Sequence, residues 1–272
     1  MIRYIANKIH WILSSQFGFD FLKFMKSVRG LPIFLRDWII FRKRFDGNMR
    51  FMPCLHDRYE EGGTTKSEYF WQDLSVAQAI YAANPIKHVD IGSRIDGFVA
   101  HIASFRNCEV FDIRPVSTII PGVVFCQADL MASEPLPMAE DGGYCDSLSC
   151  LHAIEHFGLG RYGDKLDPKG YQQGIGNMAL LLRPGGTFYL STPIGHERVE
   201  FNANWVFEPL TIVRCAEGFG LALTKLIVIT PLYGAQESAI DVDTLANLAT
   251  VRYQLGLFIF TKEAKLHPAR ET

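Results

Sequence analysis

The sequence has no cysteine pattern typical of a metal site or a disulfide framework. Its six cysteines form no C-x-x-C pair and no His-x-Cys pair. Structural zinc sites and small disulfide-rich domains both depend on such spacings. We therefore expect no metal site and six reduced, buried cysteines in an intracellular protein, packed as small apolar side chains. They are Cys54, Cys108, Cys126, Cys145, Cys150 and Cys215.

Long apolar runs are missing as well. No stretch approaches the roughly 18 charge-free residues of a membrane-spanning helix. The apolar stretch at residues 9–19 follows Arg3 and Lys8, but it is short and lacks a small-x-small cleavage site, so we expect no signal peptide. Internal repeats and low-complexity tracts are absent too. These absences favour a cytoplasmic protein.

The net charge of −2 gives no overall nucleic-acid signature. Its distribution is uneven, because residues 1–50 contain ten Lys or Arg against three Asp or Glu, which leaves −9 for the remaining residues. The N-terminal fifth is therefore a basic segment attached to an acidic body. We expect this acidic body to repel a long polyanion, which makes nucleic acid an improbable partner.

Residues 1–45 have apolar residues at helical spacing, interrupted at Gly30-Leu31-Pro32. One interpretation is that this apolar stripe covers the main domain while Lys and Arg face solvent. The other is attachment to an anionic membrane surface, since aromatic residues alternate with the cations. We predict a helical extension at residues 1–65, a main domain at 66–262 and a charged tail at 263–272.

The most informative stretch is residues 88–105, HVDIGSRIDGFVAHIASF. An apolar start leads to Asp90 and Gly92, and from Gly97 apolar residues recur at helical spacing. This predicts a strand, a tight turn and a helix whose N-terminus faces a ligand, with Asp96 as the helix N-cap. Such turns occur in many α/β folds, so the motif alone is weak evidence.

Further short apolar runs follow, each with polar residues at its end. Asp112 ends the run VFDI, 22 residues after Asp90, at the distance where an acid grips ribose hydroxyls. Asp129 follows the third run, and the fourth run, residues 145–151, leads into His152, Glu155 and His156. A fifth run lies within LLRPGGTFYLSTP (181–193), and strands are also predicted at 221–230 and 254–261. The resulting fold class is α/β.

The order HVDIGS, VFDI, CQADL, DSLSCLHAIEHF, LLRPGGTFYLSTP resembles the class I S-adenosylmethionine-dependent methyltransferase superfamily over roughly residues 70–262. The strings DIGSRIDGFVAH and EHFGLGRYGDKLDPKG resemble a methyltransferase-like family catalogued as a domain of unknown function. The resemblance implies a doubly wound, seven-stranded sheet ordered 3-2-1-4-5-7-6, with the seventh strand antiparallel. It also implies S-adenosylmethionine as the cofactor.

The resemblance assigns cofactor contacts residue by residue. Asp90 and Gly92 would hold the methionine end, Asp112 the ribose and Asp129 the adenine. The superfamily turn usually has three alternating glycines, and here Arg94 and Asp96 replace the second and third. Arg94 lacks the conformational freedom of glycine but could reach a carboxylate, and Gly97 could replace the third glycine one position late. The set of cofactor-binding residues predicted by this resemblance is Asp90, Gly92, Arg94, Gly97, Asp112, Asp129, Leu130 and Ser149.

Methyl transfer to a hydroxyl requires a group that removes its proton. The candidate catalytic residues are His152, Glu155, His156 and His196. His152 and His156 are four residues apart, which on a helix places both rings on one face. A packing role is the alternative for His156, and Asp146 is expected to steady the turn before its strand. The H-A-I-E-H order differs from the H-E-x-x-H of zinc proteases and lacks a third ligand.

Three other segments complete the predicted site. A helix at residues 67–83, capped by Ser67, would place Tyr69, Phe70 and Trp71 either along the cofactor or in the helix core. The Gly-, Asp- and Lys-rich loop 159–175 and the polar stretch 195–204 are positioned to contact an acceptor.

Two functions stay open at this point. The first is a methyltransferase acting on a small-molecule or glycan hydroxyl, in a context such as cell-surface polysaccharide synthesis. The second is a non-catalytic relative that serves as a binding or scaffolding module, which the altered glycine turn permits. A Rossmann-type oxidoreductase is disfavoured because residues 251–262 resemble the reversed seventh strand of the methyltransferase sheet.

Overall fold

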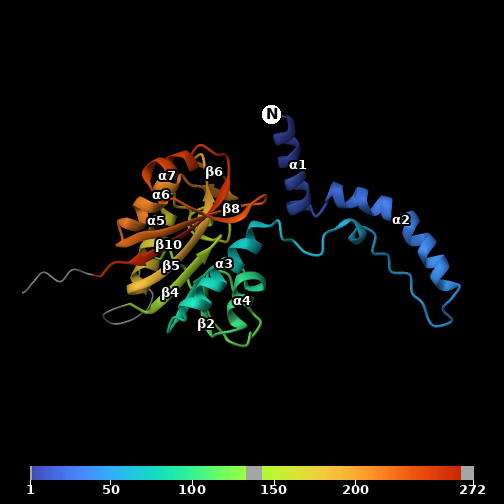
Figure 1. Ribbon diagram of the computed structural model, residues 1–272, viewed down its shortest axis with the longest axis horizontal. Helices are drawn as coiled ribbons and strands as arrows, with labels where there is room; N and C mark the ends of the chain where they lie inside the picture. Colours follow the sequence, from blue (N-terminus) through green and yellow to red (C-terminus); the bar gives the residue numbers. More distant parts are fainter. Residues whose placement is uncertain (1, 133–142, 265–272) are drawn as a thin grey trace, which may run out of the picture. The chain divides into compact units, whose positions relative to one another are not determined.

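The computed structural model describes residues 2–132 and 143–264. The chain divides into two compact units, residues 1–64 and residues 65–272 (Figure 1). The predicted tail at 263–272 lies almost entirely outside the described residues.

The N-terminal unit consists mainly of α1 (Ile2–Phe17) and α2 (Phe21–Arg42), followed by the short 3-10 helix η1 (Asp57–Tyr59). Asp20 caps α2, because its carboxylate accepts a hydrogen bond from the Lys23 N–H at 2.9 Å.

The predicted break at residues 30–32 is wrong, because α2 continues through Pro32. A proline inside a helix removes one backbone donor and strains the preceding turn without necessarily ending the helix. Gly30 serves packing instead: a Cβ at this position would stand 2.1 Å from the carbonyl oxygen of Leu55. Only glycine lets the returning chain approach the helix this closely.

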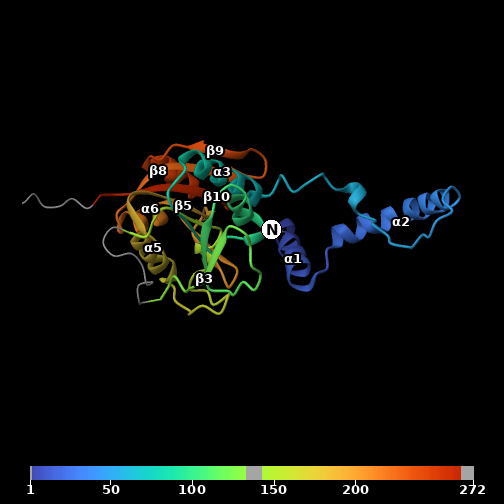
Figure 2. The same cartoon turned by 90° about the horizontal axis from the view of Figure 1, so that it is seen from below.

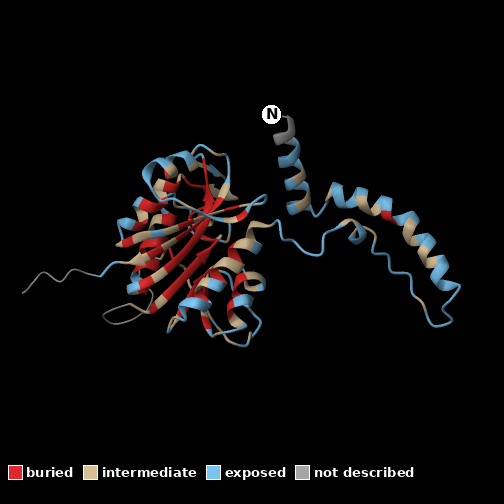
Figure 3. Ribbon diagram, in the orientation of Figure 1, coloured by how far each residue is buried: buried red, intermediate tan, exposed pale blue. Residues whose placement is uncertain are grey.

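The N-terminal unit has no apolar core of its own. Among residues 6–64, Gly30 alone is buried, and Phe17 and Leu22 are 75% and 61% exposed (Figure 3). Two helices and a connecting chain provide no second layer against which an apolar face could pack. The large apolar residues exposed here are Ile9, Trp11, Ile12, Leu13, Phe17, Phe19, Phe21, Leu22, Phe24, Met25, Val28, Leu31, Leu35, Ile39, Ile40, Phe41, Phe45, Phe51 and Met52.

A search of the described helices for one with the length and apolar character needed to cross a bilayer finds none.

The second unit is built on an eight-stranded sheet with the order β3-β2-β1-β4-β5-β10-β8-β9. The first five strands of that order are mutually parallel, and β10 runs antiparallel to both β5 and β8. The strands are β1 (His88–Ile91), β2 (Cys108–Asp112), β3 (Val123–Gln127), β4 (Cys145–Leu151), β5 (Leu182–Ile194), β8 (Leu221–Thr230), β9 (Gly234–Ser238) and β10 (Gln254–Lys262).

The predicted count of seven strands is wrong by one, and the order differs accordingly. The additional strand, β9, forms an antiparallel hairpin with β8 and occupies the sheet edge. Polar residues interrupt its short sequence, so periodicity gave no signal for it. With β9 set aside, the neighbours follow the predicted 3-2-1-4-5-7-6 arrangement, with β8 as the sixth strand and β10 as the antiparallel seventh.

Helices cover both faces of this sheet (Figures 1 and 2). One apolar core joins the sheet to α3 (Glu68–Ala83), the π-helical turn η2 (Ile95–Val99) and α4 (Ala100–Ala103). The other core joins it to α5 (Gly170–Leu181), α6 (Pro209–Glu217) and α7 (Val242–Leu248). Cys150 and Leu151, consecutive in β4, belong to opposite cores, as side-chain alternation along a strand requires. The fold is therefore a doubly wound α/β sheet, as predicted.

Two local predictions on this unit are confirmed. Ser67 caps α3 by accepting a hydrogen bond from the Tyr69 N–H at 3.3 Å. Asp146 accepts hydrogen bonds from the backbone N–H groups of Ile86 and Lys87, each at 2.7 Å, and so fixes the chain entering β1 against β4.

The prediction of uniformly buried cysteines is wrong in part. Cys108, Cys145 and Cys150 are buried in the sheet, whereas Cys54 and Cys126 are exposed. Cys126 lies on β3, the outermost strand at the end of the sheet opposite β9, where side chains have less covering structure. All six cysteines are free thiols.

Candidate functional site

The glycine turn after β1 has the conformation that the sequence predicts at Gly92. This residue has φ +68°, and its N–H donates to the Phe111 carbonyl at 2.9 Å. Because a side chain is strained at such a φ, glycine is required here. The predicted N-cap, Asp96, is wrong: Arg94 precedes the first turn, and Asp96 lies inside it as an exposed partner of Arg94 at 2.8 Å.

The turn also departs from the predicted regular helix. Residues 95–99 form a single π-helical turn before α4, a geometry that occurs often at functional sites. Gly97 lies where a Cβ would stand 2.8 Å from Oδ2 of Asp73 on α3. Its role is thus a close approach of α3 to the turn, in line with the expectation that Gly97 serves packing.

Asp90 is held by an internal hydrogen-bond network rather than facing an open site. Its side chain is 1% exposed and accepts from Ser93 N–H at 3.1 Å, Ser93 Oγ at 2.6 Å and Ser149 Oγ at 2.5 Å. Burial raises its pKa to about 6, although the serine hydrogen bonds oppose this shift. His88 completes the network at 3.2 Å from Ser149 Oγ, and burial lowers its pKa to about 3, so the ring is neutral. Asp90 and Ser149 are therefore buried residues that fix the turn after β1.

Asp112 stands at the carboxyl end of β2 and forms a bidentate pair with Arg114. The guanidinium donates from Nε at 3.0 Å and from Nη2 at 2.6 Å, and the Arg114 N–H also donates to Asp112 at 2.8 Å. A planar guanidinium matches both carboxylate oxygens. The sequence pattern did not single out Arg114, although this residue lies two positions after the acid expected to bind ribose.

Asp129 follows β3 and accepts a hydrogen bond from the Met131 N–H at 2.8 Å. The neighbouring Leu130 is 3% exposed and belongs to the core that α5 covers. Its carbonyl oxygen accepts from Asn177 Nδ2 at 2.7 Å. The turn after β3 is therefore fixed in place beside Asp112, whose carbonyl oxygen accepts from the Ala128 N–H at 3.0 Å. The predicted adenine contacts of Asp129 and Leu130 stay a prediction.

The first half of α3 lies against the carboxyl ends of β4 and β5. The Tyr69 ring stacks on His152 with a centroid distance of 4.5 Å, and the fully buried Gln72 accepts a hydrogen bond from Ser191 Oγ. Of the three aromatic residues predicted along the site, Tyr69 alone makes this contact. Trp71 packs in the adjoining core and Phe70 is 39% exposed.

His152 is enclosed by two carboxylates. Its Nδ1 lies 2.6 Å from Oε1 of Glu155, and its Nε2 lies 3.3 Å from Oε1 of Glu68 without hydrogen-bond alignment. Burial alone would lower the pKa of His152, but both carboxylates raise it, to about 10. His152 also holds down the pKa of Glu155 against the effect of burial. At neutral pH the ring is therefore a buried imidazolium, and Tyr253 Oη completes the cluster by donating to Glu68 at 2.8 Å.

The prediction that His152 and His156 share one helical face is wrong. His152 has φ +52°, and only residues 154–156 form a helical turn, of the 3-10 type. His156 points to a different set of partners. Its Nδ1 lies 2.7 Å from the Ala203 carbonyl oxygen, so Nδ1 carries the proton and Nε2 keeps its lone pair. Burial lowers the pKa of His156, and nearby Arg161 lowers it further.

The loop after His156 carries two residues that the sequence did not single out. Arg161 Nη1 donates to the Ala203 carbonyl at 2.9 Å, beside His156. The Tyr162 ring meets His156 edge-on at 5.5 Å between ring centroids. The guanidinium carbons of Arg114 and Arg161 lie 4.4 Å and 5.2 Å from the centroid of the same Tyr162 ring. The loop predicted to contact an acceptor thus connects His156 with the Asp112 pair.

Among the described residues, no hydrogen bond or ion pair joins the His196 side chain to His152, Glu155 or His156. The side chain of His196 is exposed, and its backbone N–H donates to the Val251 carbonyl at 2.8 Å. The polar stretch predicted around it is not an open loop, because β6 (Arg198–Glu200) and β7 (Asn204–Val206) form a small antiparallel sheet.

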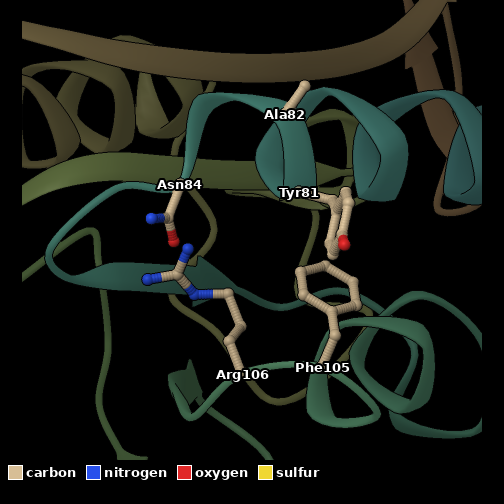
Figure 4. A pocket seen from close by; sticks show the side chains of 5 residues that line it. All are labelled: Tyr81, Ala82, Asn84, Phe105 and Arg106. Atoms are coloured by element: carbon tan, nitrogen blue, oxygen red, sulfur yellow. The ribbon is translucent and has the colours of Figure 1, made fainter.

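A pocket of about 420 Å³ lies at the opposite end of α3 (Figure 4). The rings of Tyr81 and Phe105 meet edge-to-face at 5.4 Å, and the Arg106 guanidinium donates to the Pro85 carbonyl at 2.5 Å. Since it adjoins the amino ends of β1 and β2, it is separate from the polar residues at the carboxyl edge.

One group of side chains in the described structure has ligand atoms close enough for a metal ion. His56, Asp57 and Glu60, in the N-terminal unit, place these atoms within 4.8 Å of one another. Both carboxylates are exposed, and we assign no metal to them.

Comparisons with known proteins match this fold to others. The family model described as "Caenorhabditis protein of unknown function, DUF268" matches residues 140–242. A comparison with curated proteins finds no match. Among solved structures, the chain is similar to a Burkholderia thailandensis 1,6-didemethyltoxoflavin-N1-methyltransferase with S-adenosylhomocysteine bound. The two sequences are 10% identical, the match covers 74% of this chain and 80% of that chain, and the TM-score is 0.49.

Two further solved structures show how varied such relatives are. One is the N-methyltransferase NodS from Bradyrhizobium japonicum WM9 in complex with S-adenosylhomocysteine. It is 12% identical, the match covers 72% of this chain and 88% of NodS, and the TM-score is 0.47. The other is the [4+2]-cyclase SpnF: 10% identity, 70% and 81% covered, TM-score 0.49. These likenesses concern the fold and do not specify a reaction. The fold itself rests on the strand order, which apart from the edge strand β9 follows the predicted 3-2-1-4-5-7-6 arrangement.

Proposed function

We propose that this protein is an S-adenosylmethionine-dependent methyltransferase whose acceptor is a hydroxyl group on a small molecule or glycan. The observation that carries the proposal is the sheet order with β10 antiparallel between β5 and β8. A dinucleotide-binding Rossmann sheet lacks this reversed strand, which disfavours the oxidoreductase alternative.

The residues at the carboxyl edge support a cofactor site in part. Gly92 provides a positive-φ turn and Asp112 a carboxylate at the end of β2. Asp129 and Leu130 would border the adenine, while Arg94 and Gly97 belong to the turn itself. Asp90 and Ser149 fit an indirect role, because their side chains bond to each other and are fully buried. Bound S-adenosylmethionine would supply an electrophilic methyl group on its sulfonium.

Among the four candidate bases, His156 suits proton removal best. A histidine that acts as a base must be neutral and present a lone pair, and the Ala203 carbonyl leaves the lone pair of His156 on Nε2. His152 is already protonated at neutral pH and is better suited to fixing Tyr69 and Glu68 electrostatically. Glu155 is paired with His152, and the exposed His196 side chain has no contact among the described residues that would orient it. We therefore assign the base to His156 and a positioning role to the His152–Glu155 pair.

Titration calorimetry with S-adenosylhomocysteine tests the cofactor assignment. We expect saturable binding that Asp112→Ala weakens by ~1.5–3 kcal/mol, the range for hydrogen bonds to a charged group. Asp129→Ala provides the comparison at the neighbouring turn. If the folded wild-type protein binds no S-adenosylhomocysteine, the non-catalytic scaffolding function replaces the enzyme.

We further propose that residues 1–45 attach the protein to an anionic membrane surface, in the context of cell-surface polysaccharide synthesis. Exposed aromatic and aliphatic side chains alternate there with Lys and Arg, and each cation near an anionic surface contributes ~1 kcal/mol. Co-sedimentation with anionic vesicles tests this. Binding should fall with added salt and disappear when residues 1–45 are deleted. A full-length protein that stays in the supernatant at low salt would instead favour a segment that covers another protein surface.

A further inference from the structure

We propose that Arg161, Arg114 and His156 form an oxyanion subsite that takes a carboxylate or phosphate group on the acceptor. This inference names the substrate class for the site described above. That the molecule carrying this oxyanion is the methyl acceptor rests on the proposed function. Binding of the oxyanion itself does not.

Among the residues that the structure describes, Arg161 is a cation without an anionic partner. Its side chain is exposed, and among the described residues its polar contacts are the Ala203 carbonyl oxygen and the His156 ring. No carboxylate of the described structure lies within ion-pair distance of it. A guanidinium donates five N–H groups in a fork that matches an oxyanion, so most of the donors of Arg161 are available.

The loop that carries Arg161 is held in one conformation. The Asp164 carboxylate accepts hydrogen bonds from the backbone N–H groups of Gly158, Gly160 and Tyr162, at 3.0, 3.1 and 3.1 Å. Asp164 is thereby satisfied by its own loop and does not neutralise Arg161. Gly158 has φ +79°, and a Cβ there would stand 1.9 Å from the Asp167 carbonyl oxygen. Such a loop presents its cation without a large ordering cost on binding.

Arg114 provides a second guanidinium beside the same Tyr162 ring. Its Nε and Nη2 bind Asp112, which leaves the N–H groups of Nη1 outside that bidentate pair. The Arg114 side chain is 44% exposed. The Tyr162 ring thus lies beside guanidinium groups from two separate segments, the loop after β2 and the loop after the 3-10 turn at residues 154–156. We infer that an oxyanion at this ring meets donors from both.

The carboxylates that lie against the subsite residues are each paired with a cation. Asp112 is bound to Arg114 itself at 2.6 Å, so Arg161 contributes the net positive charge. Glu155, the nearest carboxylate to His156 Nε2 at 3.9 Å, is paired with the His152 imidazolium. His156 itself is neutral, and its Nε2 lies 3.5 Å from Arg161 Nη1. Once Arg161 turns to an oxyanion, the Nε2 lone pair is available for the proton of an acceptor hydroxyl. The arrangement thus favours an acceptor that carries a hydroxyl group near an acidic group.

Histidine-selective NMR of the full-length protein tests the subsite, with sodium phosphate and sodium acetate titrated at constant pH and ionic strength. The His156 ring signal is assigned with His156→Gln. We expect a saturable shift of this signal, at least tenfold weaker affinity in Arg161→Gln, and retention of binding in Arg161→Lys. Arg214→Gln, which removes an exposed arginine on α6, is the matched control and should bind like wild type.

The two probes distinguish the source of the oxyanion. A stronger response to phosphate indicates a phosphorylated acceptor, and a stronger response to acetate indicates a carboxylated one. Calorimetry with S-adenosylhomocysteine on the same variants separates the two proposals. Phosphate or acetate binding without S-adenosylhomocysteine binding leaves the subsite standing and removes the methyltransferase. A wild-type His156 signal that does not respond to either anion, or a response that Arg161→Gln leaves unchanged, overturns the subsite.

Discussion

Replacing Glu155 by glutamine should change how the stability of the protein depends on pH. The carboxylate of Glu155 is 1% exposed and lies 2.6 Å from Nδ1 of His152, itself 7% exposed. Removing one partner of such a buried pair leaves the other charge uncompensated, which typically costs ~3–5 kcal/mol. We expect a loss of stability of this size near pH 6, where the His152 ring is charged in both the folded and the unfolded wild-type protein.

The pH dependence follows from the raised pKa of His152. Its folded pKa of about 10 exceeds the unfolded value near 6.5. The stabilisation is therefore fully present below about pH 6.5 and is lost as the pH rises toward 10. Between these values the folded state holds one more proton than the unfolded state, so the stability falls by ~1.4 kcal/mol per pH unit. From about pH 6.5 to 8.5 this amounts to ~2–3 kcal/mol.

Glu155→Gln should abolish most of this slope, because Glu68 remains as the one carboxylate beside the ring and is 22% exposed. The difference in stability between wild type and variant should thus shrink by ~2–3 kcal/mol between pH 6.5 and 8.5. Urea unfolding followed by circular dichroism at several pH values measures it. The series ends at about pH 8.5, because unfolded cysteine thiols ionise above it.

Glu217→Gln is the matched control, since Glu217 is an exposed glutamate on α6. It should leave both the stability and its pH slope unchanged. Equal slopes in wild type and Glu155→Gln, or an NMR titration of His152 near pH 6.5, would refute the paired imidazolium.

Three further substitutions test the turns and the loop. Gly92→Ala should cost ~1–3 kcal/mol of stability and lower the affinity for S-adenosylhomocysteine, because φ is +68° and the new Cβ would lie 3.1 Å from that of Ala153. A variant with the same affinity in calorimetry and the same thermal unfolding as wild type would contradict this. Gly158→Ala should abolish phosphate binding at the His156 signal, since its Cβ would overlap the Asp167 carbonyl; retained binding would show that the loop conformation is irrelevant. Arg94→Gly should change S-adenosylhomocysteine affinity less than about threefold, because the Arg94 side chain is 60% exposed and paired with Asp96; tenfold tighter binding would show that the arginine obstructs the site.

Sequence patterns predicted the elements that local signals define. The helix α3 begins after a serine cap and ends at Asn84 in the left-handed conformation, and both ends follow from residue type. The predicted strand at 221–230 coincides with β8, and 254–261 falls one residue short of β10. Alternation and apolar runs of this length are sufficient for such elements.

The site depended on contacts that no local pattern contains. The buried Asp90 carboxylate accepts a hydrogen bond from Ser149, which lies 59 residues later in the chain. The pKa of His152 depends on Glu68 from α3, and the left-handed conformation of His152 replaces the helix that its spacing to His156 predicted. The identity of the polar residues at the carboxyl edge could be predicted from the sequence, but their protonation and orientation could not.

The central place of β10 has a consequence for synthesis of the chain. This strand lies between β5 and β8, and its fully buried Phe258 and Phe260 belong to the core beneath α5 and α6. A ribosome delivers residues 182–194 and 221–230 before residues 254–262, so β5 and β8 emerge without the partner that joins them. Until then each has an open edge with unpaired backbone groups. The polypeptide is therefore most exposed to aggregation and to chaperones during the interval between synthesis of β8 and insertion of β10.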